Sequence, residues 1–333
     1  MNTDQENHRH LARQVGVFGA TMMGLGSIIG TGIFVSIGIA AGVTGPSVTL
    51  AIAVAALVAT CNALSSAQLA ANHPVSGGTY EYGYRWLHPA FGFTAGWMFL
   101  WAKTASAATA ALGFAGYVLS GFGQDWSSWE VPLAVATTVV LTALVLSGIR
   151  RSNATNIVIV SVTILALVFF ILAGLPLASA AGSSRLTPFF QPPSPDSPPW
   201  AGFFEACALM FVAYTGYGRI ATLGEEIREP RKNIPLAIVL TLVVSMGLYI
   251  AVGLVGIAAV GAETLAAATT EQAAPLAVVA RQFGIPGASM ILAVGAVTAL
   301  LGVLLNLILG LSRVLLSMGR RKDMPSIFAK LHR

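Results

Sequence analysis

The residues best suited to bind a small molecule form a glycine-rich segment, GLGSIIGTGIF, at positions 24–34. Glycine costs about 1 kcal/mol per residue in a helix relative to alanine, so this cluster predicts local unwinding. An unwound turn leaves carbonyl groups free at the end of one half-helix and N–H groups free at the start of the next. These two poles match the ammonium and the carboxylate of a small zwitterion. The segment therefore predicts a binding site for such a molecule.

A second segment, LMFVAYTGYGRIATLGEEIREP at positions 209–230, also carries glycines in its middle, Gly216 and Gly218. Tyr214, Thr215 and Tyr217 flank them. Two interrupted helices in corresponding positions, running in opposite directions, are typical of transporters built from inverted repeats.

Other interpretations of the first segment remain open. Gly26 and Gly30 form a GxxxG pattern, which also serves close helix packing in membranes. A dinucleotide-binding loop would need a preceding strand, and the surrounding sequence is continuously apolar. A selectivity filter would need repeated loops, which the sequence lacks.

The composition places these segments in a membrane protein. Hydrophobic residues make up 56% of the 333 residues and charged residues only 9%, and the mean hydropathy is +0.77. Soluble domains carry about 25% charged residues, because a surface that faces water must be hydrated. Most of this surface must therefore face lipid.

Apolar stretches long enough to cross about 30 Å of hydrocarbon recur along the chain. We expect about eight transmembrane helices, near 16–43, 47–71, 91–121, 131–149, 153–178, 200–224, 234–260 and 287–317. The fold is therefore predicted to be all-α and polytopic.

Basic residues predict the orientation, because loops on the cytoplasmic side carry an excess of lysine and arginine. One set of loops and tails holds only Arg185 and Arg281. The other set holds fourteen basic residues: Arg9, Arg13, Arg85, Arg150, Arg151, Arg228, Arg231, Lys232, Arg313, Arg320, Arg321, Lys322, Lys330 and Arg333. We expect both termini to be cytoplasmic.

The longest external loop is rich in serine and proline and is expected to be an extended linker. It divides the chain into five spans and three. The predicted organisation is a cytoplasmic tail at 1–15, a first five-helix repeat at 16–178, an external linker at 179–199, a partial second repeat of three helices at 200–317, and a cytoplasmic tail at 318–333.

The motifs GSIIGTGIF, PVSGGTYEYGYRWLHPAFGFTAGW, AYTGYGRIATLGEEIREPRKNIP and GLSRVLLSMGRRKDMP resemble those of the amino acid–polyamine–organocation permeases. They are long and spread over nearly the whole chain. The resemblance implies a leucine-transporter-like inverted-repeat fold and secondary active transport of amino acids by alternating access.

The resemblance also implies which residues bind the substrate. Ile28 sits where the family offers a carbonyl to the substrate ammonium. Gly30, Thr31 and Gly32 sit where N–H groups, and here a hydroxyl, meet the carboxylate. Val212 and Thr215 occupy the matching carbonyl positions of the sixth span, and Ala213, Tyr214 and Tyr217 are expected to border the pocket or its gate.

The sequence departs from the family pattern in two ways. The family usually has twelve spans, so the second repeat is expected to lack its last two helices, as in a fragment or a shortened relative. The fifth-span lysine that exchanges the driving proton in some bacterial members aligns with Thr163, and Thr298 is the one hydroxyl in the eighth-span region where sodium-coupled relatives place them.

Charged residues inside the spans invite functional hypotheses, because each costs a few kcal/mol in lipid. Lys103 lies near the middle of the third span, and burial favours the neutral form of a lysine. Lys103 is therefore predicted as a proton-coupling residue; the alternative is that it pairs with a carbonyl or extends its side chain along a cavity. Arg219 lies in the sixth span, and Glu205 is expected to lie too near the outer surface to pair with Lys103. The positive balance favours neutral or acidic amino acids.

Acidic and basic residues alternate at the cytoplasmic end of the sixth span. Glu225, Glu226 and Arg228 are predicted to form a salt-bridged inner gate; the alternative is a solvated helix end.

Other classes of protein fit less well. An intramembrane enzyme would need a nucleophile–base pair or a metal cluster, and the spans hold no histidine or aspartate. A channel would show a continuous polar pore. A truncated permease that binds substrate or regulates without transporting is the alternative to a working permease. We expect no cofactor, no metal and no nucleic acid, and a location in the bacterial inner membrane. A proton is the candidate coupling ion, and the oligomeric state stays open.

Overall fold

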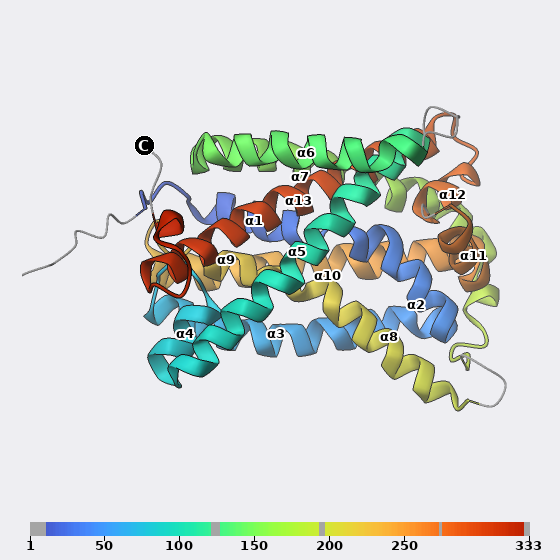
Figure 1. The fold of residues 1–333 in the computed structure, drawn as a ribbon. Helices are drawn as coiled ribbons and strands as arrows, with labels where there is room; N and C mark the ends of the chain where they lie inside the picture. The colour runs from blue at the N-terminus through green and yellow to red at the C-terminus, as the bar shows by residue number, and fades with distance from the viewer. Residues whose placement is uncertain (1–10, 121–126, 193–196, 273–274, 330–333) are drawn as a thin grey trace, which may run out of the picture.

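The computed structural model describes residues 11–120, 127–192, 197–272 and 275–329, and helices dominate these residues (Figure 1). The α-helices are α1 (Val17–Ile28), α2 (Ile37–Thr44), α3 (Val48–Asn72), α4 (Thr79–Trp86), α5 (Pro89–Ser120), α6 (Glu130–Leu146), α7 (Ile149–Ala181), α8 (Pro199–Tyr214), α9 (Gly218–Thr222), α10 (Pro230–Val260), α11 (Ala262–Gln272), α12 (Pro275–Arg281) and α13 (Ala288–Arg320). Strand pairing in this part of the chain is limited to isolated bridges, Val15 with Ile227 and Ser76 with Leu223. The predicted all-α fold is confirmed.

Each of the eight predicted spans corresponds to one helix or to one interrupted helix. Within the described residues, four helical stretches are long and apolar enough to cross a membrane: Gly32–Asn72, Ile149–Ala181, Pro230–Val260 and Ala288–Arg320. The first of these contains the second half of the first predicted span and the whole of the second predicted span, and the chain turns between them at Gly45, with φ at 68°. This left-handed conformation is one that glycine adopts without strain.

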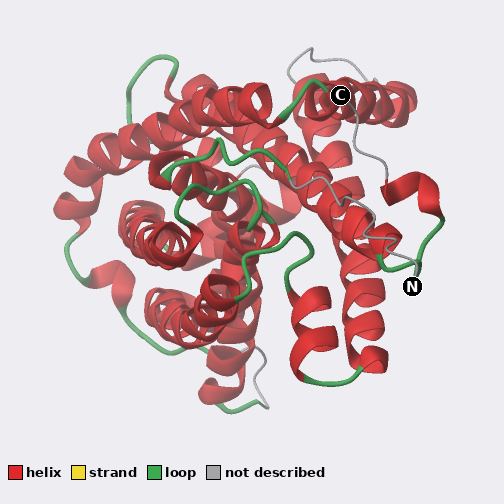
Figure 2. Cartoon of the chain, turned by 90° about the vertical axis from the view of Figure 1, so that its left-hand side faces the viewer, coloured by secondary structure: helices red, strands yellow, loops and turns green. Residues whose placement is uncertain are grey.

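Helix α1 lies at the centre of the bundle and contacts α7, α10 and α13. Met23 and Leu25 in it are buried, and small residues allow its neighbours to come close. A Cβ added at Gly24 would lie 2.4 Å from the Thr241 hydroxyl of α10. Figure 1 shows α3 and α10 running lengthwise while α5 and α8 cross obliquely, and Figure 2 shows several helices end-on.

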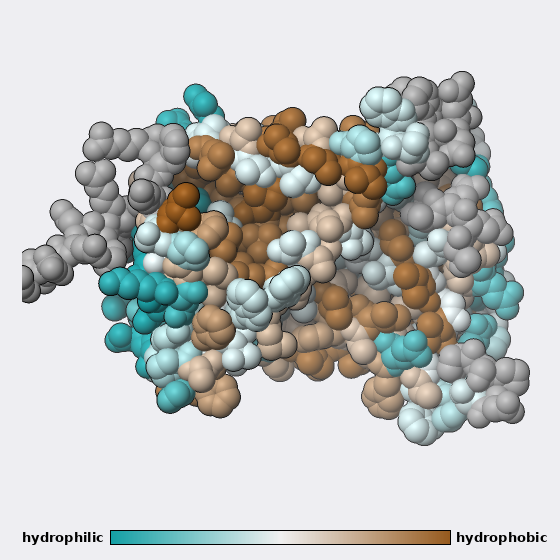
Figure 3. All heavy atoms as spheres, viewed as in Figure 1, coloured by the Kyte–Doolittle hydropathy of each residue, from teal (hydrophilic) through white to brown (hydrophobic). Residues whose placement is uncertain are grey.

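The surface separates into an apolar middle and two polar ends. Figure 3 shows hydrophobic residues across the middle of one face and hydrophilic ones at both ends. Large apolar side chains such as Leu57, Val140 and Leu165 are about two-thirds exposed, at 66%, 65% and 68%. Such a band is suited to contact with hydrocarbon rather than water. We call the end that holds Glu81, Glu225 and Arg320 the ion-pair end.

The linker between α7 and α8 is attached to the bundle rather than fully extended. Helix α7 continues to Ala181, and a short 3₁₀ turn follows at Ser184–Leu186. The N–H of Ser47 donates to the carbonyl of Phe189 at 2.9 Å, and the N–H of Gln191 donates to the carbonyl of Thr44 at 3.2 Å. These bonds fasten the linker to the turn between α2 and α3. Of the predicted linker, residues 193–196 lie outside the described part, as do Arg9, Lys330 and Arg333.

Candidate functional site

The predicted interruption of the first span is present. Helix α1 ends at Ile28, and Ile29 has an extended backbone with φ at −76° and ψ at 97°. The helix resumes with a widened π-helical turn at Gly32–Ser36, which leads into α2. Within the described residues, no backbone hydrogen bond is found from the N–H of Gly30 or Thr31. Two free donors therefore lie at the start of the second half-helix, where the macrodipole is positive.

The sixth span is interrupted in a different way. Helix α8 ends at Tyr214, and a 3₁₀ turn at Thr215–Tyr217 connects it to α9. The carbonyl of Val212 accepts a hydrogen bond from the N–H of Thr215 and another from the Thr215 hydroxyl at 2.8 Å. This backbone is tightened rather than unwound, so one of the carbonyls expected to be free already has two donors.

Glycines bring the two interruptions into contact. A Cβ added at Gly216 would lie 2.4 Å from the carbonyl oxygen of Ser27 in α1. A Cβ added at Gly32 would lie 2.6 Å from the Cβ of Ala213 and 2.7 Å from the hydroxyl of Tyr249. Distances below 3.0 Å are not found for real Cβ atoms, so glycine is required for this close approach.

Packing also explains part of the first glycine cluster. A Cβ added at Gly26 would meet the Asn156 and Asn306 side chains at 2.6 and 2.7 Å, and one at Gly30 would meet Val303 at 2.4 Å. The two interpretations of this segment are therefore compatible: Gly26 and Gly30 permit close packing, and the helix is also interrupted there.

Tyr249 of α10 completes the first interruption, and the sequence did not single it out. Its hydroxyl donates to the carbonyl of Ile28 at 2.7 Å. Its ring is fully buried and lies against the ring of Tyr214, with centroids 5.1 Å apart. The signal in the sequence was one tyrosine within an apolar span, which is also common in ordinary cores.

A cavity of about 190 Å³ opens between the two interruptions. This volume suits a small solute, since drug-sized ligands occupy roughly 300–1,000 Å³. Of the residues predicted to bind substrate, six line it: Ile28, Thr31, Gly32, Val212, Ala213 and Thr215. Gly30, Tyr214 and Tyr217 are not among its lining residues. A larger hollow of about 430 Å³, lined by Arg13, Pro74 and Glu229–Lys232, lies away from both interruptions.

Two cations face the same cavity. Lys103 and Arg219 both line it, and both lie by the ring of Phe99, with Lys103 Nζ 6.0 Å and Arg219 Cζ 5.8 Å from its centroid. Arg219 is only 4% exposed. Glu205 is exposed on α8 and does not line the cavity.

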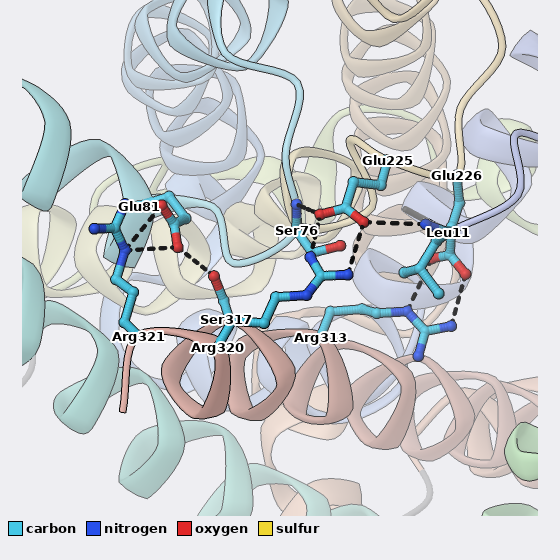
Figure 4. A network of polar contacts seen from close by, with 9 residues as sticks. All are labelled: Leu11, Ser76, Glu81, Glu225, Glu226, Arg313, Ser317, Arg320 and Arg321. Carbon is cyan, nitrogen blue, oxygen red and sulfur yellow. Dashed lines mark hydrogen bonds and ion pairs between the residues drawn. The ribbon is translucent and has the colours of Figure 1, made fainter. Parts of the chain in front are cut away.

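The predicted gate residues Glu225 and Glu226 form ion pairs, but with partners that the sequence did not indicate (Figure 4). Arg320 of α13 pairs with Glu225 at 2.6 Å, and Arg313 of α13 donates twice to Glu226, at 2.9 and 2.6 Å. Arg228 is exposed, and its backbone N–H donates to the carbonyl of Val15 at 2.8 Å.

The surroundings of Glu225 stabilise its charged form. Burial raises the pKa of this carboxyl, but the hydrogen bonds from Arg320, Ser76 and Leu11 outweigh burial and hold the pKa below its ordinary value of 4.5. The N–H groups of Ser76 and Leu11 donate at 3.1 and 3.2 Å.

A third ion pair lies beside these two. Arg321 pairs with Glu81 of α4, which also accepts a hydrogen bond from the Ser317 hydroxyl. The hydroxyls of Tyr80 and Tyr84 donate to Asp323, each at 2.6 Å. The end of α13 is therefore connected to α4 and to the segment after α9.

The two hydroxyls compared with ion-coupling positions lie together. Thr163 of α7 and Thr298 of α13 share a hydrogen bond of 2.9 Å. Between the same two helices, the Asn306 side chain of α13 donates to the Asn156 side chain of α7 at 2.6 Å. These polar pairs connect α7 and α13 inside the apolar bundle.

Comparison with known proteins gives a consistent result. A family model described as amino acid permease matches residues 19–333. An uncharacterized transporter of Mycobacterium tuberculosis is 41% identical over 322 residues, which cover 97% of this chain and 69% of the relative. The branched-chain amino acid permease BcaP of Bacillus subtilis is 29% identical over 97% of this chain and 70% of its own length. The crystal structure of MhsT in complex with L-phenylalanine aligns with a TM-score of 0.63 at 17% identity, covering 95% of this chain and 76% of that chain.

Proposed function

The chain belongs to the amino acid permease family, and from this premise we propose that it moves a small amino acid across the membrane by alternating access. It is a multi-pass integral membrane protein with a leucine-transporter-like fold. The observation that supports the proposal best is the interrupted first span, which leaves the N–H groups of Gly30 and Thr31 free and of which Ile28, Thr31 and Gly32 line a cavity of about 190 Å³.

In the proposed complex, the amino acid lies across the first interruption. Its carboxylate accepts from the N–H groups of Gly30, Thr31 and Gly32, at the positive end of the second half-helix. Its ammonium donates to the carbonyl of Ile28, which has a second lone pair beside the hydrogen bond from Tyr249.

The sixth span closes the other side of the proposed site. Val212, Ala213 and Thr215 line the cavity, and Val212 is also 66% exposed. Tyr214 and Tyr217 are buried behind the lining and act in this proposal as supports of the wall.

The proposed topology places the ion-pair end in the cytoplasm of a bacterial cell, with the protein in the inner membrane. The tails at 1–15 and 318–333 would be cytoplasmic and the linker at 179–199 external. Residues 16–178 and 200–317 would form the first repeat and part of the second. Glu225 and Glu226, with Arg320 and Arg313, would form the inner gate that must part when the site opens inward.

Lys103 is the proposed proton-coupling residue. It lines the cavity and is partly shielded from solvent, so its protonation would respond to whether substrate is present. Symport with a proton would use this response directly.

The function is tested by uptake of radiolabelled amino acids into proteoliposomes, with Gly216→Ala as the diagnostic variant. The added Cβ would lie 2.4 Å from the Ser27 carbonyl, so the two interruptions must move apart and uptake is expected to fall by at least about tenfold. Gly247→Ala is the matched control, because a Cβ there has nothing within 4 Å. Absence of both uptake and countertransport for every amino acid, or full uptake by Gly216→Ala, would contradict the proposal.

A further inference from the structure

Arg219 is a buried cation for which no acidic partner is found among the described residues. It is 4% exposed, and its Nε and Nη1 atoms are buried with no hydrogen-bond partner. The ion pairs found in the described part of the chain involve other arginines. An unpaired charge in a protein interior costs several kcal/mol, so a structural arginine is normally bonded on most of its N–H groups.

The bundle contains a space shaped for this side chain. A Cβ added at Gly310 of α13 would lie 1.1 Å from Arg219 Nη1, so only glycine at this position leaves room for the guanidinium. The Arg219 side chain of α9 thus packs in a defined space against α13, where it also lines the cavity between the two interruptions.

Lys103 adds a second positive charge to the same cavity. Its Nζ and the Arg219 guanidinium lie by the same Phe99 ring, at 6.0 and 5.8 Å from the centroid. The π face offers both cations a weak attraction, but it carries no net charge. Among the described residues that line the cavity, none is acidic. The empty site therefore has an excess of positive charge.

The nearby helix ends do not remove this excess. Helices α1 and α8 both end next to the cavity, and their carbonyl ends each carry about half a negative charge. Those ends would be neutralised by the ammonium of a bound amino acid, and the N–H groups at Gly30–Gly32 would be neutralised by its α-carboxylate. The charges of Arg219 and Lys103 remain.

We propose that the substrate is an acidic amino acid of the aspartate or glutamate class, whose side-chain carboxylate binds Arg219 and Lys103. This rests on the proposed function, since the α-carboxylate and ammonium use the interrupted first span. A guanidinium fits a carboxylate with two parallel hydrogen bonds, which would satisfy donors that the empty site leaves unbonded. Cationic amino acids are excluded by the same charges.

The test measures binding of L-glutamate and L-aspartate to the purified full chain, against their uncharged counterparts L-glutamine and L-asparagine. The members of each pair have nearly the same shape, so the ratio of their dissociation constants isolates the charge. We expect each acid to bind roughly tenfold to a hundredfold more tightly than its amide, the range typical of charge-assisted hydrogen bonds. L-lysine is expected not to compete.

Two variants assign the effect to the proposed residues. Arg219→Gln and Lys103→Met are each expected to reduce the glutamate-to-glutamine preference by at least about tenfold. Arg185→Gln and Lys232→Met change exposed cations that do not line the cavity and are expected to keep it. In the absence of ligand, Arg219→Gln is expected to melt at or above the wild-type temperature, because it removes an unpaired buried charge. A residue with a purely structural role would give the opposite shift.

The outcomes separate this inference from the function on which it rests. Equal affinity for glutamate and glutamine, or an unchanged preference in both variants, would overturn the acidic-substrate assignment while leaving amino acid transport intact. Failure to bind or transport any amino acid would overturn both. If Arg219→Gln does not fold, Arg219→Lys, which keeps the charge, and Lys103→Met still decide the question.

Discussion

Tyr249 contributes a hydroxyl to the backbone of the interrupted first span from a helix far away in the sequence. The bond to the Ile28 carbonyl is 2.7 Å long and both groups are buried. Without this donor, a carbonyl that the interruption removes from the helical ladder would have no protein partner in the empty site. The hydroxyl therefore stabilises the interruption when no substrate is bound.

Tyr249→Phe is expected to lower the free energy of unfolding of the empty protein by about 1 kcal/mol, the typical contribution of one hydrogen bond. Thermal unfolding in detergent, with and without substrate, measures this loss. Tyr214→Phe is the matched control for stability, because the Tyr214 hydroxyl is buried and has no hydrogen-bond partner among the described residues, so its removal is expected to cost nothing. Equal losses in both variants would contradict the assigned role.

Lys103 provides a second prediction for single residues. If Lys103 carries the coupled proton, Lys103→Met is expected to make uptake nearly independent of external pH and of an imposed proton gradient. Uptake at several pH values in proteoliposomes measures this, with Lys232→Met as the control. A Lys103→Met protein that keeps the full pH dependence of the wild type would rule out coupling through this residue.

Single residues differ in how far the sequence reveals them. Lys103 and Arg219 were found because a charge inside an apolar span is conspicuous. Tyr249 was missed because its role depends on which helix packs beside α1. The same applies to Arg313 and Arg320, which pair with glutamates 87 and 95 positions away, whereas the sequence suggested the adjacent Arg228.

Among the elements, the two interrupted helices were predicted with unequal success. Glycine content predicted both interruptions, because glycine weakens a helix wherever it occurs. It did not distinguish the unwinding of the first span from the close approach of the sixth span to the first, at which Gly216 lies against the backbone of Ser27. That distinction depends on what lies opposite each glycine, which only the assembled bundle determines.

Each of the eight predicted spans corresponds to a helix or an interrupted helix, whereas the short helices α4, α11 and α12 were not predicted. These have 8, 11 and 7 residues, so they are too short to cross the hydrocarbon and a search for membrane spans does not detect them. Helix α4 is nevertheless important, because it brings Glu81 to Arg321.

At the scale of the whole molecule, the ion-pair end connects segments that are far apart in sequence. Glu225 alone joins the chain before α1, the loop before α4 and the end of α13. Its depressed pKa links this assembly to pH. A carboxyl whose pKa is lower in the folded state stabilises that state above the unfolded pKa, and the contribution is lost as pH falls through the folded value.

We therefore expect the wild-type protein to lose stability progressively as the pH falls below 4.5, the ordinary pKa of the Glu225 carboxyl. Glu225→Gln should be less stable at neutral pH and should show a smaller decline on acidification. Melting temperatures between pH 3 and about 7 test this. Glu263→Gln removes an exposed carboxylate of α11 and should follow the wild type. A parallel decline in Glu225→Gln would contradict the assignment.

The three arginines near the end of α13 also have a consequence for speed. Arg313 and Arg320 lie in α13 and Arg321 directly follows it, yet they pair with glutamates on two other segments: Glu225 and Glu226 after α9, and Glu81 in α4. If the end of α13 moves away as a unit, the three ion pairs must separate in the same motion. The free energies of breaking them then add up in a single activation barrier. The step that separates these ion pairs is then expected to be the slowest step of each transport cycle. Dissolved salt weakens each pair and should therefore accelerate turnover.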